Sequence, residues 1–305
     1  MINYQKIISD IYHELKNEED TGQVAAYIPE LGNVDPDKFG VHLTTVDDQH
    51  YFIGDSEEKF SIQSIAKVLS LVLASKLGPE LLTDRVGVEP SGTPFNSLFQ
   101  LEHDQGIPRN PFINAGALVI SDFLFSKLSK PKADFIGFVR QISGNPEINY
   151  STRIAESEKS AGYRNAALIN LMKSFGNINN DVDAVLDFYF HLCSIEMTCR
   201  ELSRTFLFLA TDGVDTYTQQ EIVNTSSSKR LNAIMQLCGF YDEAGEFSFR
   251  VGLPGKSGVG GGIAAISPNK YSIAVWSPRL NHKGNSNQGM KFLEAFTSKT
   301  DSSIF

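Results

Sequence analysis

The chain has 305 residues, of which 41% are hydrophobic and 21% charged, and its 27 basic and 36 acidic residues give a net charge of −9. This composition is typical of a globular protein that can bury a core and a pocket without disulfides or metals. No basic run is present, which argues against nucleic-acid binding, because such binding depends on clustered Lys and Arg that displace counterions.

The first predicted element is an amphipathic helix near residues 2–17, whose apolar and charged residues alternate with helical spacing. This segment lacks the apolar stretch and small-residue cleavage site of a signal peptide. No stretch of the chain approaches the roughly 18 uncharged apolar residues that a membrane-spanning helix needs. We therefore expect a cytoplasmic protein with no membrane partner.

Two strands are predicted within "FGVHLTTVDDQHYFIGD", around a turn at Asp47 and Asp48. From Ser64 to about residue 239 the pattern is mainly helical, with "SIAKVLSLVLASKLG" ending at Gly78 and "FINAGALVISDFLFSKLS" stopping before Pro131. Strand character returns in "EFSFRVGLPGKSGVGGGIAAISPNKYSIAVWSP", and a last helix is expected near residues 288–299.

Strands at both ends with helices between them predict an α+β (α/β) fold. One antiparallel sheet would be built from both chain ends and flanked by helices, with a helical subdomain beside it. We expect a single domain over residues 1–305, with the sheet in residues 1–70 and 240–305 and the helical part in residues 71–239. Clefts commonly form at such a junction.

The motif S-x-x-K places a serine and a lysine on one helical face, where the amine can take the hydroxyl proton. By itself it is weak, because the chain contains it five times, beginning at Ser56, Ser64, Ser129, Ser226 and Ser267. Only Ser64 opens a strongly apolar helix, where unpaired N–H groups of the first turn could stabilise an oxyanion. The other four copies lie in charged, turn or helix-end segments and are best explained as surface.

Lys67 lies beside Val68, Leu69 and Leu71. Burial among them would lower its pKa from about 10.4 toward about 7 to 8, where a lysine is a useful base. The alternative is that Ser64 only caps the helix and Lys67 extends to water. Within this short segment alone, that alternative is favoured.

A second motif lies in "LPGKSGVGGGI", where Lys256, Ser257 and Gly258 resemble the K-T-G strand triad of penicillin-recognising enzymes. Its glycines would let the backbone approach a substrate, so that an N–H near Val259 could supply a second oxyanion donor. The same segment nearly matches a phosphate-binding loop. Arg250 stands where the first glycine of that loop belongs, which argues against it.

Two further features are weaker. The segment "ESEKSAGYRNAAL" brings Glu156, Glu158, Tyr163 and Asn165 to a predicted helix start, which alone is explained by capping. The 6 histidines show no zinc-binding spacing, and the 3 cysteines (Cys193, Cys199 and Cys238) follow no metal or redox spacing. We therefore expect reduced thiols and no metal. A Ser-His-Asp triad assembled from distant residues stays open, although no motif indicates one.

Taken together, seven segments occur in the order found in the serine-dependent glutaminases, and the chain resembles the bare catalytic domain of the bacterial members. The segments are "VAAYIPEL", "FSIQSIAKV", "RNPFINAGAL", "ESEKSAGYRNAAL", "FYFHLCSI", "GFYDEAGEF" and "GKSGVGGGI". The resemblance implies a β-lactamase-like fold and hydrolysis of the side-chain amide of L-glutamine to L-glutamate and ammonia. It also implies a homo-oligomer, dimer or tetramer, and no cofactor.

The resemblance also implies roles for individual residues. Ser64 would be the nucleophile and Lys67 its base, Tyr241 would relay protons to the leaving ammonia, and Tyr27 would contact the substrate near the scissile amide. The family positions that hold the amino acid fall, besides Ser64 and Tyr241, on Asn114, Glu158, Asn165, Tyr189 and the backbone of Val259. Glu158 suits the substrate ammonium, and the two amides and the Tyr189 hydroxyl suit its carboxylate. The role of Lys256 is open.

Two other functions compete with this one. A penicillin-binding protein or β-lactamase shares the Ser-Lys pair and the K-[ST]-G strand, but works outside the cytoplasm. A catalytically inactive glutamine-binding module is the third candidate, and no feature favours it while both Ser64 and Lys67 are present.

Overall fold

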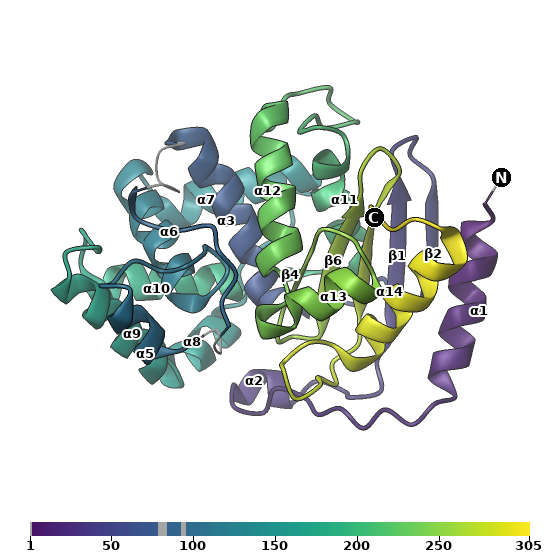
Figure 1. The fold of residues 1–305 in the computed structure, drawn as a ribbon, viewed down its shortest axis with the longest axis horizontal. Helices are drawn as coiled ribbons and strands as arrows, with labels where there is room; N and C mark the ends of the chain where they lie inside the picture. The colour runs from purple at the N-terminus through teal and green to yellow at the C-terminus, as the bar shows by residue number, and fades with distance from the viewer. Residues whose placement is uncertain (1, 79–83, 93–95) are drawn as a thin grey trace.

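A five-stranded antiparallel sheet, in the order β2-β1-β7-β6-β5, lies at the centre of the part of the chain that the computed structural model describes, residues 2–78, 84–92 and 96–305 (Figure 1). Its strands are β1 (Gly40–Thr45), β2 (His50–Gly54), β5 (Gly255–Ser257), β6 (Gly262–Ser267) and β7 (Tyr271–Trp276). The register pairs Val41 with Val275 and Ile263 with Val275. Strands from the two ends of the chain therefore meet in one sheet, and the predicted α+β class is confirmed.

The central strands are buried on both faces because their side chains alternate between two cores. Val41 and Leu43 pack in one core with the first and last helices of the chain. His42 and Thr44, which point to the opposite face, both contact the Ser203 hydroxyl. Every residue of β1, β6 and β7 is buried, so the sheet must be covered on both sides.

One face is covered by α1 (Tyr4–Lys16) and α14 (Asn287–Thr300), which lie side by side (Figure 1). Helix α1 begins where it does because the Asn3 side chain accepts a hydrogen bond from the Lys6 N–H. Its buried residues Ile8, Ile11 and Leu15 follow the helical spacing. The two ends of the chain thus cover the sheet that they build.

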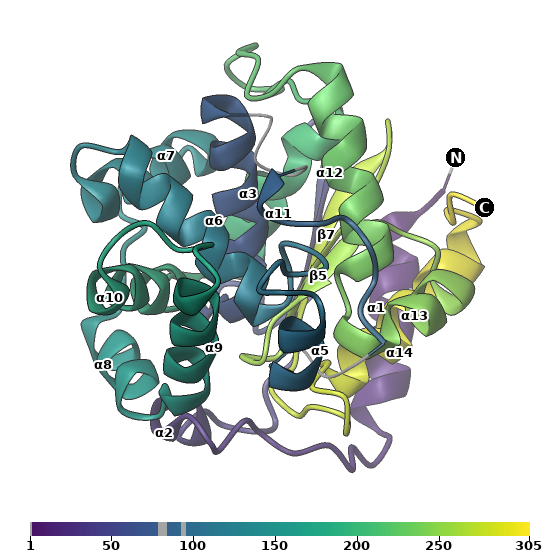
Figure 2. The same cartoon turned by 60° about the vertical axis from the view of Figure 1, so that its left-hand side comes forward.

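The other face is covered by α11 (Cys199–Ala210), which begins with a capping box made by Thr198 and Glu201. Beyond it lies the helical part of the molecule (Figure 2). Its elements are α3 (Ala66–Leu77), α5 (Leu98–His103), α6 (Asn114–Lys127), α7 (Pro131–Ser143), α8 (Thr152–Ser160), α9 (Tyr163–Ser174), α10 (Val182–Cys193) and α12 (Thr225–Cys238). A short ladder of β3 (Phe60–Ser61) and β4 (Glu196–Met197) joins this part to the sheet region.

The predicted strand beginning at Glu246 is wrong, because residues 244–250 form helix α13 (Ala244–Arg250). The alternating sequence would place Phe247 and Phe249 on one face of a strand. In the helix they separate instead: Phe247 is fully buried and stacks on Phe240, whereas Phe249 is 91% exposed. A sequence with strand-like alternation can therefore form a short helix when only one of its two aromatic side chains packs into the core.

Two helix starts also differ from the prediction. Ser64 lies in a 3-10 turn, η1 (Gln63–Ile65), and helix α3 follows only at Ala66. Glu158 lies in the last turn of α8 rather than at a helix start, and α9 begins five residues later at Tyr163. Among the described residues, no helix is long and apolar enough to cross a membrane.

Candidate active site

Ser64 follows a strained backbone position between β3 and α3. Gln63, directly before it, has φ +48°, and Tyr241, in the 3-10 turn η2 (Tyr241–Glu243), has φ +56°. Residues with side chains rarely adopt this left-handed region, and such strain concentrates at functional sites. Tyr241 is buried, and its hydroxyl interacts with Ser64 and Ser257.

Lys67 is buried one turn beyond Ser64 and is 3% exposed. Its Nζ donates hydrogen bonds to the Phe112 carbonyl at 3.2 Å and to Asn114 Oδ1 at 2.7 Å. Within the described structure, no hydrogen bond joins Lys67 Nζ to the Ser64 hydroxyl; catalytic hydrogen bonds often tighten only when substrate binds. Burial lowers the pKa of Lys67 to about 8, so an appreciable fraction of the amine is neutral near physiological pH.

A cavity of about 300 Å³ lies beside this pair. The residues that line it include seven of the predicted site residues: Tyr27, Ser64, Asn114, Glu158, Asn165, Tyr189 and Val259. Lys67 reaches it through Asn114, and Tyr241 lies behind Ser64. These residues come from distant parts of the chain, and folding brings them around one cavity that would enclose a small polar molecule.

Part of the wall of this cavity is polar, and its polar groups are incompletely paired within the described structure. Asn114 Nδ2 donates to Asn165 Oδ1 at 2.9 Å. Glu158 is 8% exposed, and its Oε1 has no hydrogen-bond partner within the described structure. Burial raises the pKa of Glu158 to about 7, although Gln63 and Lys67 oppose that shift. A buried carboxylate oxygen without a partner is costly unless a cation pairs with it.

The turn between β5 and β6 approaches the Ser64 segment closely because it is made of glycines. A Cβ added at Gly258 would lie 2.5 Å from the Ile62 carbonyl oxygen and 3.3 Å from the Ser64 nitrogen. Only a residue without a side chain fits there. The backbone that carries Val259 is thereby held beside Ser64, which makes the N–H groups of both residues candidate oxyanion donors.

Lys256, whose role the sequence leaves open, is fully buried beneath Tyr241. Its Nζ lies 4.3 Å from the centroid of the Tyr241 ring and donates to the carbonyls of Gly239, at 2.9 Å, and Ser257. Burial, and secondarily the charge of Lys67, lower the pKa of Lys256 well below its ordinary value. Burial also raises the pKa of Tyr241 to about 12, so its hydroxyl keeps a proton to donate. Lys256 thus supports the strained segment that carries Tyr241.

Sequence reasoning missed several residues that build this site. Gln63 donates to the Ser61 hydroxyl and contacts Glu158. Asn110 accepts from the N–H groups of Phe112 and Ile113, which fixes the turn that presents the Phe112 carbonyl to Lys67. The Asn-Pro dipeptide at residues 110–111 is a turn signal that could have identified this position.

Tyr189 and Cys193 form another part of the cavity wall. Both line the cavity, both are buried, and their side chains hydrogen-bond to each other. Burial raises the pKa of the Cys193 thiol to about 12, so it is an inert neutral group rather than a nucleophile. No cluster of three or more His, Cys, Asp or Glu side chains that could hold a metal ion occurs in the described parts of the chain.

Solved structures define the fold class to which this arrangement belongs. The chain superposes on a probable glutaminase, ybaS, with a TM-score of 0.93 at 32% identity, covering 99% of this chain and 98% of that chain. It superposes on a probable glutaminase from Bacillus subtilis, solved with 6-diazo-5-oxo-L-norleucine, with a TM-score of 0.89 at 28% identity, covering 100% of this chain and 98% of that one. The fold is therefore the β-lactamase-like fold of bacterial glutaminases.

Sequence comparison gives the family. The family model Glutaminase matches residues 22–305. A glutaminase of Saccharophagus degradans is 63% identical over 305 residues, covering 100% of this chain and 99% of the relative. One of Christiangramia forsetii is 57% identical over 304 residues, covering 100% of both chains. The chain belongs to the glutaminase family.

Proposed function

We propose that this chain is a glutaminase that hydrolyses the side-chain amide of L-glutamine to L-glutamate and ammonia. The observation that carries the proposal is the cavity lined by both Ser64 and the buried Glu158 carboxylate, whose Oε1 has no hydrogen-bond partner in the described structure. The similar Bacillus subtilis protein was solved with 6-diazo-5-oxo-L-norleucine, which is itself an α-amino acid. Both facts support a substrate that carries an ammonium group as well as a reactive side chain.

In the first step, neutral Lys67 takes the proton of Ser64, and Ser64 Oγ attacks the side-chain carbonyl carbon of glutamine. The N–H groups of Ser64 and Val259 stabilise the oxyanion. Tyr241, whose hydroxyl is protonated at neutral pH, donates a proton to the departing nitrogen and recovers one through Lys67. Ammonia leaves, and a γ-glutamyl ester on Ser64 remains.

In the second step, water gives up a proton to the same base and attacks the ester carbonyl, which releases glutamate and restores Ser64. Throughout both steps Glu158 pairs with the substrate ammonium, while Asn114, Asn165 and Tyr189 donate to its carboxylate. Tyr27 closes the cavity near the scissile amide. The two charges of the free amino acid are thereby paired when the cavity removes them from water.

We further propose that residues 1–305 act as a single catalytic domain, in the cytoplasm and as a homo-oligomer, dimer or tetramer. Resemblance to the family supports these statements. Light scattering on the purified protein tests the assembly: a mass of two or four chains of 33.7 kDa supports it, and a stable monomer contradicts it.

The function is tested by following ammonia and glutamate during incubation of the purified protein with L-glutamine. We expect both products to form in equal amounts. Binding of glutamine without turnover would instead indicate the inactive binding module. Covalent labelling by penicillin, with no release of ammonia from glutamine, would indicate a penicillin-recognising enzyme.

A further inference from the structure

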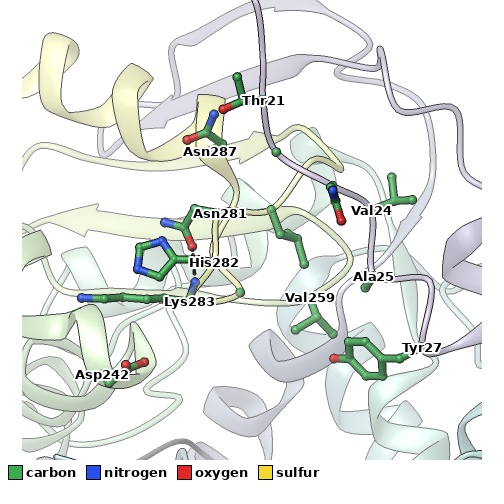
Figure 3. A pocket seen from close by; sticks show the side chains of 14 residues that line it. Thr21, Val24, Ala25, Tyr27, Asp242, Val259, Asn281, His282, Lys283 and Asn287 are labelled. Carbon is green, nitrogen blue, oxygen red and sulfur yellow. Dashed lines mark hydrogen bonds between the residues drawn. The ribbon is translucent and has the colours of Figure 1, made fainter.

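A second and larger cavity, of about 810 Å³, shares two lining residues with the cavity beside Ser64; Figure 3 shows the residues that line this second cavity. Tyr27 and Val259 line both cavities and form the wall between them. The side chains of Asp242, His282 and Lys283 gather on the opposite side of the second cavity from Tyr27 (Figure 3). We call this second cavity the outer chamber.

The outer chamber borders the reacting end of the proposed substrate rather than its amino-acid end. Glu158, Asn165 and Tyr189, which would hold the amino-acid end, line only the first cavity. Gly284 lines the outer chamber, and a Cβ added there would lie 3.9 Å from both Tyr241 Cε2 and Val259 Cγ1. Tyr241 is the proposed proton donor to the leaving nitrogen. The chamber therefore opens on the side to which the nitrogen departs.

Ammonia and water do not need such a space, since each occupies only about 30 Å³ in the liquid. The volume leaves room for a substituent on the departing nitrogen at least as large as an amino acid. Among the described residues, the chamber is lined by one cation, Lys283, and one anion, Asp242. The Lys283 side chain is 25% exposed, and its Nζ pairs with Glu246 at the long distance of 3.8 Å. An ion pair at this distance is weak, so a carboxylate in the chamber could compete with Glu246 for the Lys283 ammonium.

Lys283 is carried by a loop whose backbone is held in place. The Asn281 side chain accepts hydrogen bonds from the N–H groups of Lys283 and Asn285, at 3.0 and 3.1 Å. The amides of Asn281 and Asn285 both donate to the buried carboxylate of Glu243. The backbone of Lys283 is thus fixed before any ligand binds, which lowers the entropy cost of binding an anion.

We infer that the outer chamber is a subsite for a substituent on the leaving nitrogen, and that the enzyme also hydrolyses γ-glutamyl amides of amino acids, with Lys283 meeting the carboxylate of the released amino acid. The inference rests on the proposed glutaminase chemistry. Ser64 Oγ forms a bond to the γ-carbonyl carbon, the bond from that carbon to nitrogen breaks, and the nitrogen takes the proton delivered by Tyr241. The amino acid leaves in place of ammonia, and water then hydrolyses the same γ-glutamyl ester.

The experiment compares three substrates of the full-length protein: L-glutamine, γ-glutamylglycine and the uncharged γ-glutamylmethylamide. We expect glutamate release from all three. Lys283→Glu should lower kcat/KM for γ-glutamylglycine by about tenfold, the effect of replacing a favourable charge by a repulsive one. It should leave kcat/KM for the other two substrates within about twofold. Lys291→Glu on α14, which pairs with Glu18 outside the chamber, is the matched control and should alter none.

Three outcomes would each overturn a different part of the proposal. Hydrolysis of glutamine with no cleavage of either substituted amide would overturn the outer-chamber subsite and leave the glutaminase function standing. Equal loss on all three substrates in Lys283→Glu would overturn the role of Lys283 in meeting a carboxylate. No hydrolysis of glutamine itself would overturn the proposed function on which the inference rests.

Discussion

Glu158 lines the small cavity and Lys67 reaches it through Asn114; both are buried titratable groups, and the proposed chemistry needs both without their protons. The pKa of Lys67 is lowered to about 8, and that of Glu158 is raised to about 7, in both cases chiefly by burial. Protonation of Lys67 removes the base. Protonation of Glu158 removes the charge that pairs with the substrate ammonium. Both changes act in the same direction as the pH falls.

We therefore predict that kcat/KM for glutamine falls as pH is lowered through 8 and then 7, and that a pH profile of initial rates shows both transitions. Glu158→Gln should remove the transition near 7 and raise KM roughly 10- to 100-fold, the value of a hydrogen bond to a charged group. The fall of kcat/KM near pH 8, which reports Lys67, should remain in this variant. A profile that is flat between pH 6 and 9 would contradict these assignments.

The residue types at the site could be predicted from sequence, but several of their contacts could not. S-x-x-K and K-S-G are local motifs whose chemistry depends on residue type and spacing. Gln63 and Asn110 act through hydrogen bonds to neighbours that only the tertiary structure fixes. The missing partner of Glu158 Oε1 is a property of the folded cavity and has no counterpart in the sequence.

At the scale of elements, the site depends on the contact between the β5–β6 turn and the turn that carries Ser64. Gly258 and Gly260 both approach that segment so closely that an added Cβ would lie within 2.5 Å of the Ile62 oxygen and 2.3 Å of the Ser61 oxygen, respectively. The contact joins the sheet to the start of α3. In the proposed mechanism, the spacing of this contact decides whether the N–H groups of Ser64 and Val259 converge on the oxyanion.

We predict that Gly258→Ala lowers kcat for glutamine by about 100- to 1,000-fold, the effect of losing one oxyanion donor, with the protein still folded. Steady-state kinetics and circular dichroism measure the two properties. Gly137→Ala is the matched control, because the interior of α7 offers no heavy atom within 4 Å of the added Cβ. It should raise the free energy of unfolding by about 0.5 to 1 kcal/mol without changing kcat. Normal turnover in Gly258→Ala would show that the close approach of Gly258 to the Ser64 segment is not needed for catalysis.

Sequence alternation predicts the strands of the sheet correctly but fails at one short helix. The sheet strands were predictable because alternation and turn residues coincide, as at Asp48, which has φ +64° in the β1–β2 turn. The alternation in residues 246–250 is the same signal, yet it belongs to α13, because Phe247 stacks on Phe240 and Phe249 faces solvent. A short segment can fit both the strand period of 2 and the helix period of 3.6, and tertiary packing decides which structure forms.

At the scale of the whole molecule, the sheet joins the two ends of the chain, and α1 and α14 close one of its faces. Phe292 of α14 is fully buried in that core, against Phe39 and Phe296. The opposite core continues from the other face of the sheet into the helical part, through Trp276 and Phe60. Loss of packing at one face of the sheet should therefore destabilise the whole molecule.

We predict that Phe292→Ala lowers the free energy of unfolding by about 3 to 5 kcal/mol, the usual cost of removing a buried phenylalanine. Urea denaturation followed by tryptophan fluorescence, far-ultraviolet circular dichroism and residual activity should give coincident transitions, as for one cooperative domain. A helical signal that persists after Trp276 fluorescence has changed would show that the two parts unfold separately.

The central claim is that Ser64 carries the γ-glutamyl group, and mass spectrometry of acid-quenched enzyme tests it most directly. During turnover of glutamine we predict a γ-glutamyl adduct on the peptide that contains Ser64. The adduct and ammonia release should both be lost in Ser64→Ala, and both should be strongly slowed in Lys67→Ala. Turnover that persists in Ser64→Ala, or an adduct on a different residue, would contradict the account.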